Sequence, residues 1–171
     1  MERLDNLYSI VAMTEKTRAI GRKNEMLYHL PEDLSYFKET TLNHTIVMGY
    51  NTYMSFPKRP LPNRKNIVLT RHDRVLEGAY ILHGIEEVLD YARSHRDENI
   101  FIVGGDTIYR QFMPYVSKLY ITLIREDEEV EAEAFFPEIE EEVWVKVSEE
   151  EGRQVPERAP SYTFTVWELK K

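Results

Sequence analysis

The feature that most constrains the fold is an alternation of short apolar runs with segments of helical spacing, which occupies most of the chain before Pro114. The apolar runs have strand lengths and most end at glycine or at a polar turn. We expect strands at residues 7–13, 45–48, 66–69, 80–82 and 100–103, and helices at residues 31–42, 50–55, 85–92 and 107–113. Because strands that alternate with helices at this spacing form crossover units, the pattern predicts a mostly parallel sheet with about four flanking helices.

The pattern changes after Pro114. Residues 119–124, 144–148 and 162–169 read as strands with no helices between them, so we expect antiparallel strands at one edge of the sheet. The sequence thus predicts an α/β fold with one mixed sheet, and its 171 residues are most simply one domain, 1–171. Six acidic residues within 126–133 are expected to form a solvated turn without chemistry.

The composition limits the possible partners and location. A net charge of −8 argues against a broad nucleic-acid-binding surface. No apolar run has the length needed to span a membrane, and the polar N-terminus has no signal-peptide core, so we expect a cytoplasmic protein. The absence of cysteine excludes disulfides and thiolate zinc sites, and no metal site is predicted.

One predicted helix carries an acid on its apolar side. Pro31 suits the first helical position, and Leu30, Leu34 and Phe37 follow the spacing of one buried stripe. Asp33 lies within that stripe, where a carboxylate is costly unless something uses it. The alternative is that Asp33 only complements the positive end of the helix dipole.

Three of the predicted strands end in groups that suit anions. They are Gly49 with Thr52, Thr70 with Arg71, and the pair Gly104-Gly105. Ligands of open α/β sheets lie outside the carboxyl ends of the strands, where backbone N–H groups, hydroxyls and cations can hold phosphates. Each glycine alone could be a tight turn, but together they predict a ligand with several phosphates. The G-x-G-x-x-G fingerprint is absent, so a Rossmann pyrophosphate site is not expected.

These motifs, in their order and spacing, resemble the bacterial dihydrofolate reductase family across nearly the whole chain. The matching segments are Ile20-Gly21, Leu30-Pro31-Glu32-Asp33-Leu34-Ser35-Tyr36-Phe37-Lys38, Val47-Met48-Gly49 with Thr52, Phe56-Pro57-Lys58-Arg59-Pro60-Leu61-Pro62-Asn63-Arg64, Val103-Gly104-Gly105 with Ile108-Tyr109, and Leu119-Tyr120-Ile121-Thr122.

The resemblance implies reduction of 7,8-dihydrofolate to tetrahydrofolate, with hydride transfer from NADPH to C6 and protonation at N5. It gives catalytic roles to Asp33, which would bond the pterin, to Thr122, which would brace that carboxylate, and to Tyr28. It implies that Arg64 binds the α-carboxylate of the substrate's glutamate tail, for which a guanidinium is well suited. The substrate-binding residues that it implies are Val11, Asp33, Leu34, Phe37, Lys38, Phe56, Leu61, Arg64, Val103 and Thr122. Asp33 would act through water and the ring's protonation or tautomer instead of donating the proton itself.

The resemblance also implies an NADPH site and a lid formed by the loop at residues 20–29. In this family the Gly-Gly peptide bond is cis. The implied cofactor-binding residues are Ala12, Met13, Ile20, Gly21, Asn24, Met26, Gly49, Tyr50, Asn51, Thr52, Leu69, Thr70, Arg71, Val103, Gly104, Gly105, Asp106, Thr107, Ile108 and Tyr109.

The sequence departs from the family pattern in four places, one of which is an extra residue in the loop at residues 14–19. Tyr50 stands where a basic residue usually follows the Met-Gly pair, so cofactor binding is expected to depend on Arg71 and His72. Residues 27–28 are Leu-Tyr where Pro-Trp is usual, which should loosen the lid. Asp106 replaces a small residue and brings a negative charge near the phosphates unless it caps the following helix.

Two other functions are compatible with parts of the pattern. A pyrimidine reductase of flavin synthesis with the same fold would share the cofactor turns and lack the Leu-Pro-Glu-Asp helix. A non-catalytic nucleotide-binding module would have no reason to bury Asp33 beside Thr122. Nothing in the sequence demands an oligomer, so a monomer is expected.

Overall fold

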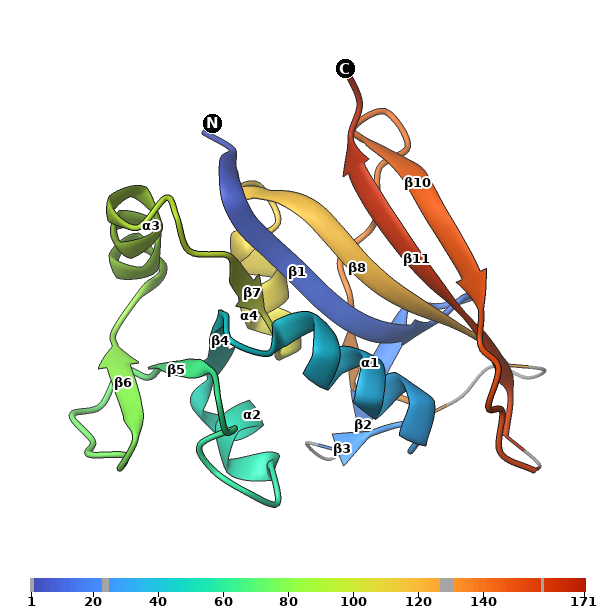
Figure 1. The fold of residues 1–171 in the computed structure, drawn as a ribbon, viewed down its shortest axis with the longest axis horizontal. Coiled ribbons are helices and arrows are strands. Elements are labelled where there is room, and N and C mark those ends of the chain that lie inside the picture. The colour runs from blue at the N-terminus through green and yellow to red at the C-terminus, as the bar shows by residue number, and fades with distance from the viewer. Residues whose placement is uncertain (1, 23–24, 127–130, 158) are drawn as a thin grey trace.

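A computed structural model of the protein describes residues 2–22, 25–126, 131–157 and 159–171. In the described residues an eight-stranded sheet runs in the order β10-β11-β8-β1-β7-β4-β5-β6 (Figure 1). Its strands are β1 (Leu4–Thr14), β4 (Thr45–Gly49), β5 (Lys65–Leu69), β6 (Ala79–Leu82), β7 (Ile100–Ile102), β8 (Val116–Arg125), β10 (Trp144–Glu151) and β11 (Ser161–Leu169). The helices are α1 (Pro31–Thr41), α2 (Tyr50–Ser55), α3 (Ile85–Ser94) and α4 (Asp106–Phe112).

The strand directions confirm the predicted mixed sheet. The strands from β8 across to β6 pair in parallel with their neighbours, whereas β11 is antiparallel to both β8 and β10. The register sets Gly49 opposite Leu69 and Ala12 opposite Thr122. The carboxyl ends of the parallel strands β4 and β5 therefore lie side by side, as the alternation of strands and helices predicted.

Apolar side chains cover both faces of the parallel strands, which explains their near-continuous hydrophobic runs. On one face, Val47 and Ile102 belong to a core that includes α3 and α4. On the other face, Met48 and Phe101 pack against side chains of α1 and α2. In Figure 1, α1 lies in front of the sheet beside the lower part of β1, and α4 lies behind β1 and β7. The first two helices therefore share the face on which Asp33 is carried.

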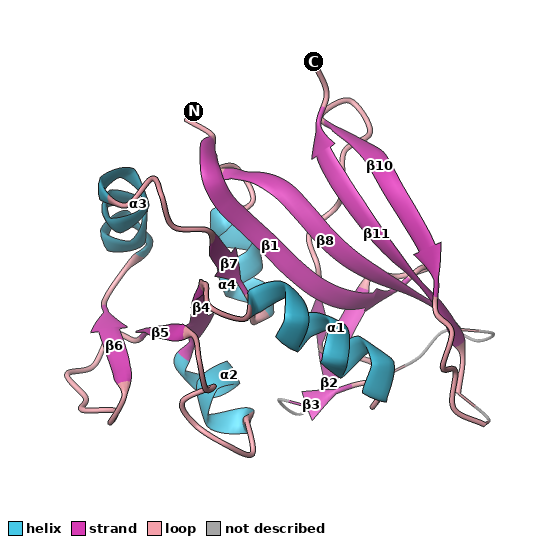
Figure 2. Cartoon of the chain, viewed as in Figure 1, coloured by secondary structure: helices cyan, strands magenta, loops and turns pink. Residues whose placement is uncertain are grey.

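A second, three-stranded sheet corrects the prediction of a plain loop at residues 20–29. Its order is β3-β2-β9, with β2 at Ala19–Arg22, β3 at Glu25–Met26 and β9 at Ala134–Phe135 (Figure 2). Strands of two to four residues are too short to show an alternating pattern in the sequence. The predicted lid is thus partly built of strands.

In the acidic segment that follows β8, Glu131 and Glu133 are exposed as predicted, but Glu126 departs from the predicted solvated turn. Glu126 is buried, and its Oε1 accepts a hydrogen bond from the backbone N–H of Lys16 at 3.1 Å. The N–H of Glu133 donates to the carbonyl of Gly21 at 2.9 Å. Residues 127–130 of this segment lie outside the described residues. The described part of the segment therefore packs against the chain at Lys16 and at β2.

The described residues contain no helix that is long and apolar enough to cross a membrane.

Candidate active site

The site is built around the start of α1. Leu30 is the N-cap and Pro31 the first helical residue, so the helix begins where the fixed φ of proline predicted. Asp33 follows in the first turn, on the side that faces β8. There the hydroxyl of Thr122 donates a hydrogen bond of 2.6 Å to Asp33 Oδ1. The acid and its partner, predicted from a resemblance, are thus brought together by the packing of α1 on the sheet.

The surroundings of Asp33 favour its neutral form. Burial raises the pKa of this carboxyl, the hydrogen bond from Thr122 opposes the rise, and the negative charge of Glu32 adds to it. Its second oxygen, Oδ2, makes no hydrogen bond to any residue that the structure describes. One carboxylate oxygen is therefore held by the protein, while the other is available to a ligand.

Replacing Thr122 should change the acidity of Asp33. Thr122→Val keeps nearly the same side-chain volume but removes the donor, which should lower the free energy of unfolding by about 1–3 kcal/mol. Because the lost hydrogen bond lowers the pKa of Asp33, that pKa should rise further in the variant. Thr122→Ser, which keeps a hydroxyl, is the control. Carboxyl titration by NMR checks the prediction, and a pKa of Asp33 that stays unchanged in Thr122→Val would contradict it.

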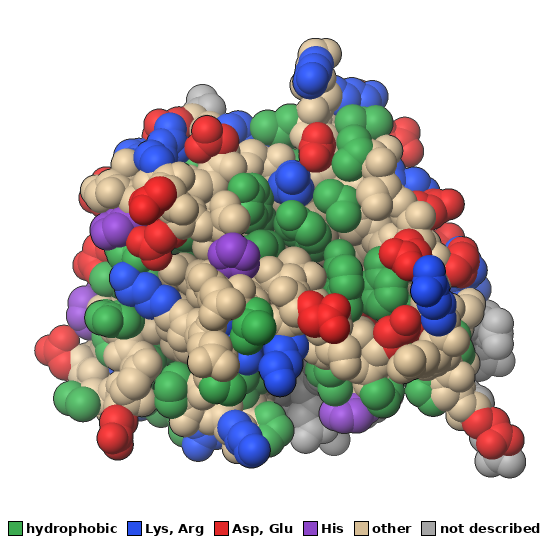
Figure 3. All heavy atoms as spheres, in the orientation of Figure 1, with side chains coloured by type: hydrophobic (Ala, Val, Ile, Leu, Met, Phe, Trp, Pro, Cys, Tyr) green, Lys and Arg blue, Asp and Glu red, His purple; other side chains and the backbone are tan. Residues whose placement is uncertain are grey.

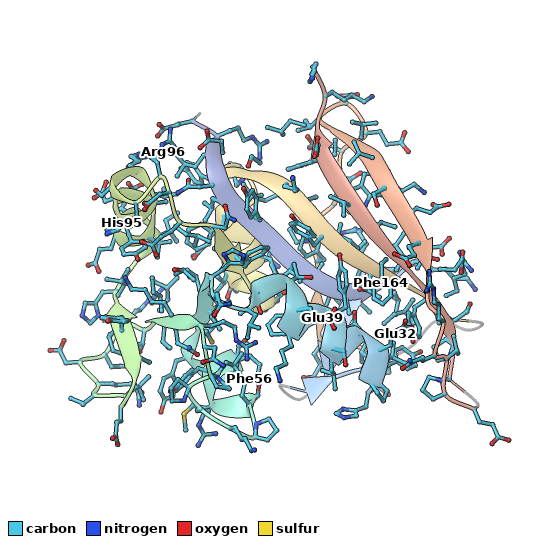
Figure 4. The ribbon with its side chains drawn as sticks, viewed as in Figure 1. Glu32, Glu39, Phe56, His95, Arg96 and Phe164 are labelled. Carbon is cyan, nitrogen blue, oxygen red and sulfur yellow. The ribbon has the colours of Figure 1, made fainter. Side chains whose placement is uncertain are left out.

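The neighbouring Glu32 has a different role from Asp33. Its Oε1 accepts hydrogen bonds from the backbone N–H groups of Arg153 at 2.8 Å and Gln154 at 3.0 Å, and from the Tyr162 hydroxyl at 2.7 Å. Figure 4 shows Glu32 at the end of α1 that lies next to β11. Burial alone would raise the pKa of Glu32, but these hydrogen bonds lower it. Glu32 therefore ties the turn between β10 and β11 to the start of α1.

Glu32→Gln should destabilise the protein in a pH-dependent way. Because its folded pKa lies below the unfolded value, ionised Glu32 adds stability at neutral pH that is lost as the pH falls through the lowered pKa. We expect a loss of about 1 kcal/mol at pH 7 for this half-exposed group. Urea unfolding at neutral and acidic pH tests this. The control is Glu39→Gln on the exposed side of the same helix (Figure 4), and an equal loss at both pH values would argue against the interpretation.

Aromatic and aliphatic side chains surround the acid. Phe37, Phe56 and Leu61, from α1 and the segment after α2, pack against the core formed by Met48 and Val103. Figure 4 shows Phe56 at the end of α2 and Phe164 beside α1. Tyr36 stacks on Phe164 with ring centroids 4.4 Å apart. Figure 3 shows more hydrophobic side chains over β1, β8 and β11 on this face, where α1 leaves the sheet uncovered. These groups form the apolar side of the site.

The remaining predicted substrate residues, and Tyr28, for which the resemblance implied a catalytic role, lie in β1, in α1 and just before α1. Val11 is buried in β1, and Leu34 is half-buried in α1. Tyr28, which precedes α1, packs with Leu30 and Ile124. Lys38 is exposed in the last turn of α1.

Arg64 is held at the far end of α1. Its Nε donates to the carbonyl of Pro62 at 3.0 Å and its Nη1 to the hydroxyl of Thr41, the last residue of α1, at 3.3 Å. No hydrogen bond joins its Nη2 to a described residue. The guanidinium is thus fixed on one side and available for a carboxylate on the other.

The glycines predicted to hold phosphates meet at the ends of β4 and β7. The N–H of Gly49 donates to the carbonyl of Gly104 at 2.9 Å, and the Gly104–Gly105 peptide bond is cis. A Cβ on Gly49 would lie 3.3 Å from Ile108, and one on Gly105 would lie 3.4 Å from the Thr52 hydroxyl oxygen. Gly104 has a φ of +121°, which a side chain would strain. The absence of side chains therefore lets these strand ends and helices approach closely.

The other predicted cofactor residues lie on the same edge or near it. Tyr109 is buried and donates a hydrogen bond of 2.7 Å to the carbonyl of Ile10, and burial raises its pKa. Thr70 and Arg71 directly follow β5. Residues placed on the elements that the sequence suggested are Ala12 and Met13 in β1, Ile20 and Gly21 in β2, Asn51 in α2, Leu69 in β5, and Thr107 in α4. Asn24 and the side chain of Met26 lie outside what the structure describes.

Asp106 does not cap α4, in contrast to the role considered for it. The N-cap is Gly105, and Asp106 is the first helical residue, with its carboxylate 3.7 Å from Arg110 Nη2. Arg110, one turn further along α4, therefore partly offsets the negative charge that Asp106 brings near Gly104 and Gly105.

Sequence reasoning missed two residues at the edge formed by β4, β5 and β6. The guanidinium of Arg74 lies 4.0 Å from the centroid of the Tyr50 ring. The Nδ1 atom of His83 is 2.9 Å from the carbonyl oxygen of Thr70. The basic cluster of Arg71, His72 and Arg74 was a signal for the first contact, but nothing in the sequence paired Arg74 with Tyr50.

Comparisons with known proteins agree with this arrangement. A sequence profile of the family described as dihydrofolate reductase matches residues 6–169. The dihydrofolate reductase of Bacillus subtilis (strain 168) is 38% identical over 165 residues, which cover 96% of this chain and 95% of that protein. The dihydrofolate reductase of Neisseria gonorrhoeae is 39% identical over 157 residues, which cover 91% of this chain and 94% of that protein.

A solved structure of dihydrofolate reductase from Enterococcus faecalis, complexed with NADP(H) and RAB-propyl, is 34% identical and superposes with a TM-score of 0.85 over 100% of both chains. The fold and these matches define an α/β oxidoreductase. The chain belongs to the dihydrofolate reductase family. The pyrimidine reductase and the non-catalytic nucleotide-binding module are not favoured.

Proposed function

We propose that this protein reduces 7,8-dihydrofolate to 5,6,7,8-tetrahydrofolate with NADPH as the hydride donor. The observation that carries the proposal is the Asp33–Thr122 pair, in which a carboxyl with a raised pKa keeps one oxygen free beside an apolar wall. Asp33 is half-buried, and its Oδ2 is not one of the buried polar atoms that lack a partner, so this oxygen can be reached by a ligand. Membership of the dihydrofolate reductase family supports the same reaction.

The substrate would lie between α1 and the segment after α2. Asp33 Oδ2 would accept hydrogen bonds from the pterin ring, while Leu34, Phe37 and Phe56 would contact its faces and the benzoyl ring. Arg64 would bind the α-carboxylate of the glutamate tail through the edge of its guanidinium. Lys38, exposed one turn before the end of α1, would add a weaker attraction.

The strand ends fit a dinucleotide with several phosphates. Gly49 and the pair Gly104-Gly105 leave room that a Cβ would fill, and the N–H groups of Gly104 and Gly105 with the hydroxyl of Thr52 suit phosphate oxygens. Thr70 and Arg71 directly follow β5, at the edge where the 2′-phosphate would lie. When bound, NADPH supplies the hydride that reduces C6. The E. faecalis relative of known structure was solved as a complex with NADP(H), which supports this choice of cofactor.

The protein's own contribution to the chemistry would be orientation, exclusion of water and control of a proton. The apolar wall would hold the pterin against the nicotinamide in a dry site. Asp33 would favour the protonated or tautomeric form of the ring that accepts a proton at N5, with water as the final donor. Tyr28, on the segment that leads into α1, would close this side of the pocket with its ring and hydroxyl.

The proposal is tested by the loss of reduced-nicotinamide absorbance when the purified protein is mixed with NADPH and dihydrofolate. We expect turnover with dihydrofolate and none with the pyrimidine intermediate of flavin synthesis. NADPH oxidation with the pyrimidine alone, or with neither compound, would contradict the proposal.

We also infer that the protein works as a cytoplasmic monomer and does not bind nucleic acid. The net charge of −8 supports the last of these inferences, because a phosphate backbone would be repelled. Size-exclusion chromatography with light scattering would test the monomer, and the elution of a dimer would contradict it.

A further inference from the structure

Arg74 has an unusual position for an exposed arginine in an acidic protein. Its guanidinium lies over the face of the Tyr50 ring, 4.0 Å from the ring centroid. Within the described part of the chain, Arg74 forms no hydrogen bond and no ion pair. The cation is thus placed by an aromatic surface and not neutralised by a carboxylate.

The stack lies at the edge of the sheet that the cofactor would occupy. Tyr50 is the first residue of α2 and directly follows Gly49, which pairs with Leu69 across β4 and β5. Thr70 and Arg71 come directly after Leu69. The contact between Tyr50 and Arg74 therefore joins the segment after β4 to the segment after β5.

Stacking on a ring suits a guanidinium that has to bind an anion. A guanidinium that stacks on a ring uses its face for the attraction, so its N–H groups remain free at the edge of the plane. Those N–H groups match the oxygens of a phosphate. The ring also restricts a long side chain that would otherwise lose conformational freedom on binding, which favours affinity.

Two other residues shape the charge at this edge. His83, which follows β6, has Nδ1 2.9 Å from the Thr70 carbonyl oxygen, and its Nε2 lies 3.6 Å from a carboxylate oxygen of Asp73. The carboxylate of Asp73, the residue before Arg74, thus lies near His83 and forms no ion pair with Arg74. The arginines on either side, Arg71 and Arg74, are the permanent cations of this segment.

We propose that Arg74, held on the Tyr50 ring, binds the 2′-phosphate of NADPH and is the residue that makes this protein prefer NADPH to NADH. Family members usually carry a positive charge at the position of Tyr50. In this protein Arg74, in the loop after β5, would supply that charge, and the ring of Tyr50 would hold the Arg74 side chain in place. This inference rests on the proposed function for the identity of the cofactor. It differs from the expectation drawn from the sequence, in which cofactor binding depends on Arg71 and His72.

Calorimetric titration with NADP⁺ and NAD⁺ tests the inference without turnover. For Arg74→Ala we expect the dissociation constant for NADP⁺ to rise about tenfold or more, because charge-assisted hydrogen bonds are lost, while that for NAD⁺ is unchanged. Tyr50→Leu should lose most of the same preference, and Tyr50→Phe, which keeps the ring, should retain it. Arg96→Ala is the matched control, because Arg96 is an exposed arginine next to α3 (Figure 4) that pairs with Asp5 at 3.3 Å.

The Tyr50 variants also test whether the Tyr50 ring holds Arg74 in place or whether the charge of Arg74 acts without the ring. In the Tyr50→Leu background, Arg74→Ala should weaken NADP⁺ binding less than it does in the wild-type protein, because the cation is no longer held in place. Equal effects in the two backgrounds would refute the role of Tyr50. An unchanged NADP⁺ preference in Arg74→Ala, with a lost preference in Arg71→Ala, would refute the role of Arg74. Neither result would affect the proposed function, which fails only if the wild-type protein does not oxidise NADPH with dihydrofolate.

Discussion

Asp33→Asn is expected to lower kcat/KM for dihydrofolate by about 10²-fold, within the range for loss of a positioned acid–base group. The amide keeps an oxygen that can accept the hydrogen bond from Thr122, but it cannot take up or release a proton. In the wild-type protein the rate of hydride transfer should fall as the pH rises through the raised pKa of Asp33, because the neutral carboxyl favours proton delivery. This dependence should be absent in the variant. Stopped-flow measurements of NADPH oxidation over a range of pH will show it.

Asp33→Asn should also stabilise the protein. A gain in stability would show that Asp33 is kept for function, because the loss of a structural acid would lower the stability. Because the folded pKa of Asp33 is raised, its contribution to stability is fully present below the unfolded pKa and is lost as the pH rises through the folded pKa. Asp33→Asn should therefore have a higher Tm than the wild type at pH 7, with no gain at a pH below the ordinary pKa of aspartate. Glu39→Gln, which changes an exposed acid on the same helix, should alter neither rate nor Tm. A lower Tm for Asp33→Asn at pH 7 would mean that the carboxylate is a structural group.

Arg64→Ala is expected to raise the dissociation constant for dihydrofolate by about 10- to 100-fold, because hydrogen bonds to a charged group are each worth about 1.5–3 kcal/mol. The contacts of Arg64 with Pro62 and Thr41 orient the side chain before the substrate arrives, so little of this energy is spent on ordering it. The rate of hydride transfer at saturating substrate should change little, because the glutamate tail is remote from C6. Binding by fluorescence quenching and single-turnover kinetics will distinguish the two quantities.

A substrate without the tail provides the control for Arg64. A dihydropterin that lacks the benzoylglutamate group should bind equally to the wild type and to Arg64→Ala. Lys38→Ala should weaken dihydrofolate binding by less than about fivefold, since exposed charges contribute about 1 kcal/mol or less. If Arg64→Ala weakened both ligands equally, a local loss of structure would explain the result and the carboxylate role would be wrong.

The large sheet could be predicted because its signals are local and repeated. The runs that became β4, β5 and β7 are apolar on both faces, which is what parallel strands covered by helices require. The start of α1 followed from Pro31 in the same way. Each of these features depends on residues that are neighbours in the sequence, so a reading of the chain alone could find them.

The small sheet and the burial of Glu126 could not be predicted, because they depend on partners distant in the chain. The strand Glu25–Met26 has two residues and no period, and β2 pairs with β9, more than a hundred residues later. Glu126 stands in a run of acids that resembles a solvated turn, yet it accepts a hydrogen bond from the loop after β1. A run of charged residues predicts that the segment as a whole is exposed to solvent, but it does not predict the contacts of a single residue such as Glu126.

In the site, too, the contacts between residues that are distant in the sequence could not be predicted from local patterns. Thr122 and Asp33 are 89 residues apart, so their pairing came from a family resemblance and not from spacing. The stack of Arg74 on Tyr50 has no equivalent in a motif, because it depends on the path of the exposed loop after β5. Departures from a family pattern, such as Tyr50, therefore mark the places where the structure adds most to the sequence.

The central claim is that this site transfers hydride from NADPH to C6 of dihydrofolate and that Asp33 promotes the transfer. The most direct measurement is a single turnover with NADPH that carries deuterium at both hydrogen positions of C4 of the nicotinamide, followed by mass spectrometry and NMR of the product. The account predicts tetrahydrofolate with one deuterium at C6, formed more slowly by Asp33→Asn but with the same labelling. Product without deuterium at C6, or equal rates for the two proteins across the pH range, would contradict it.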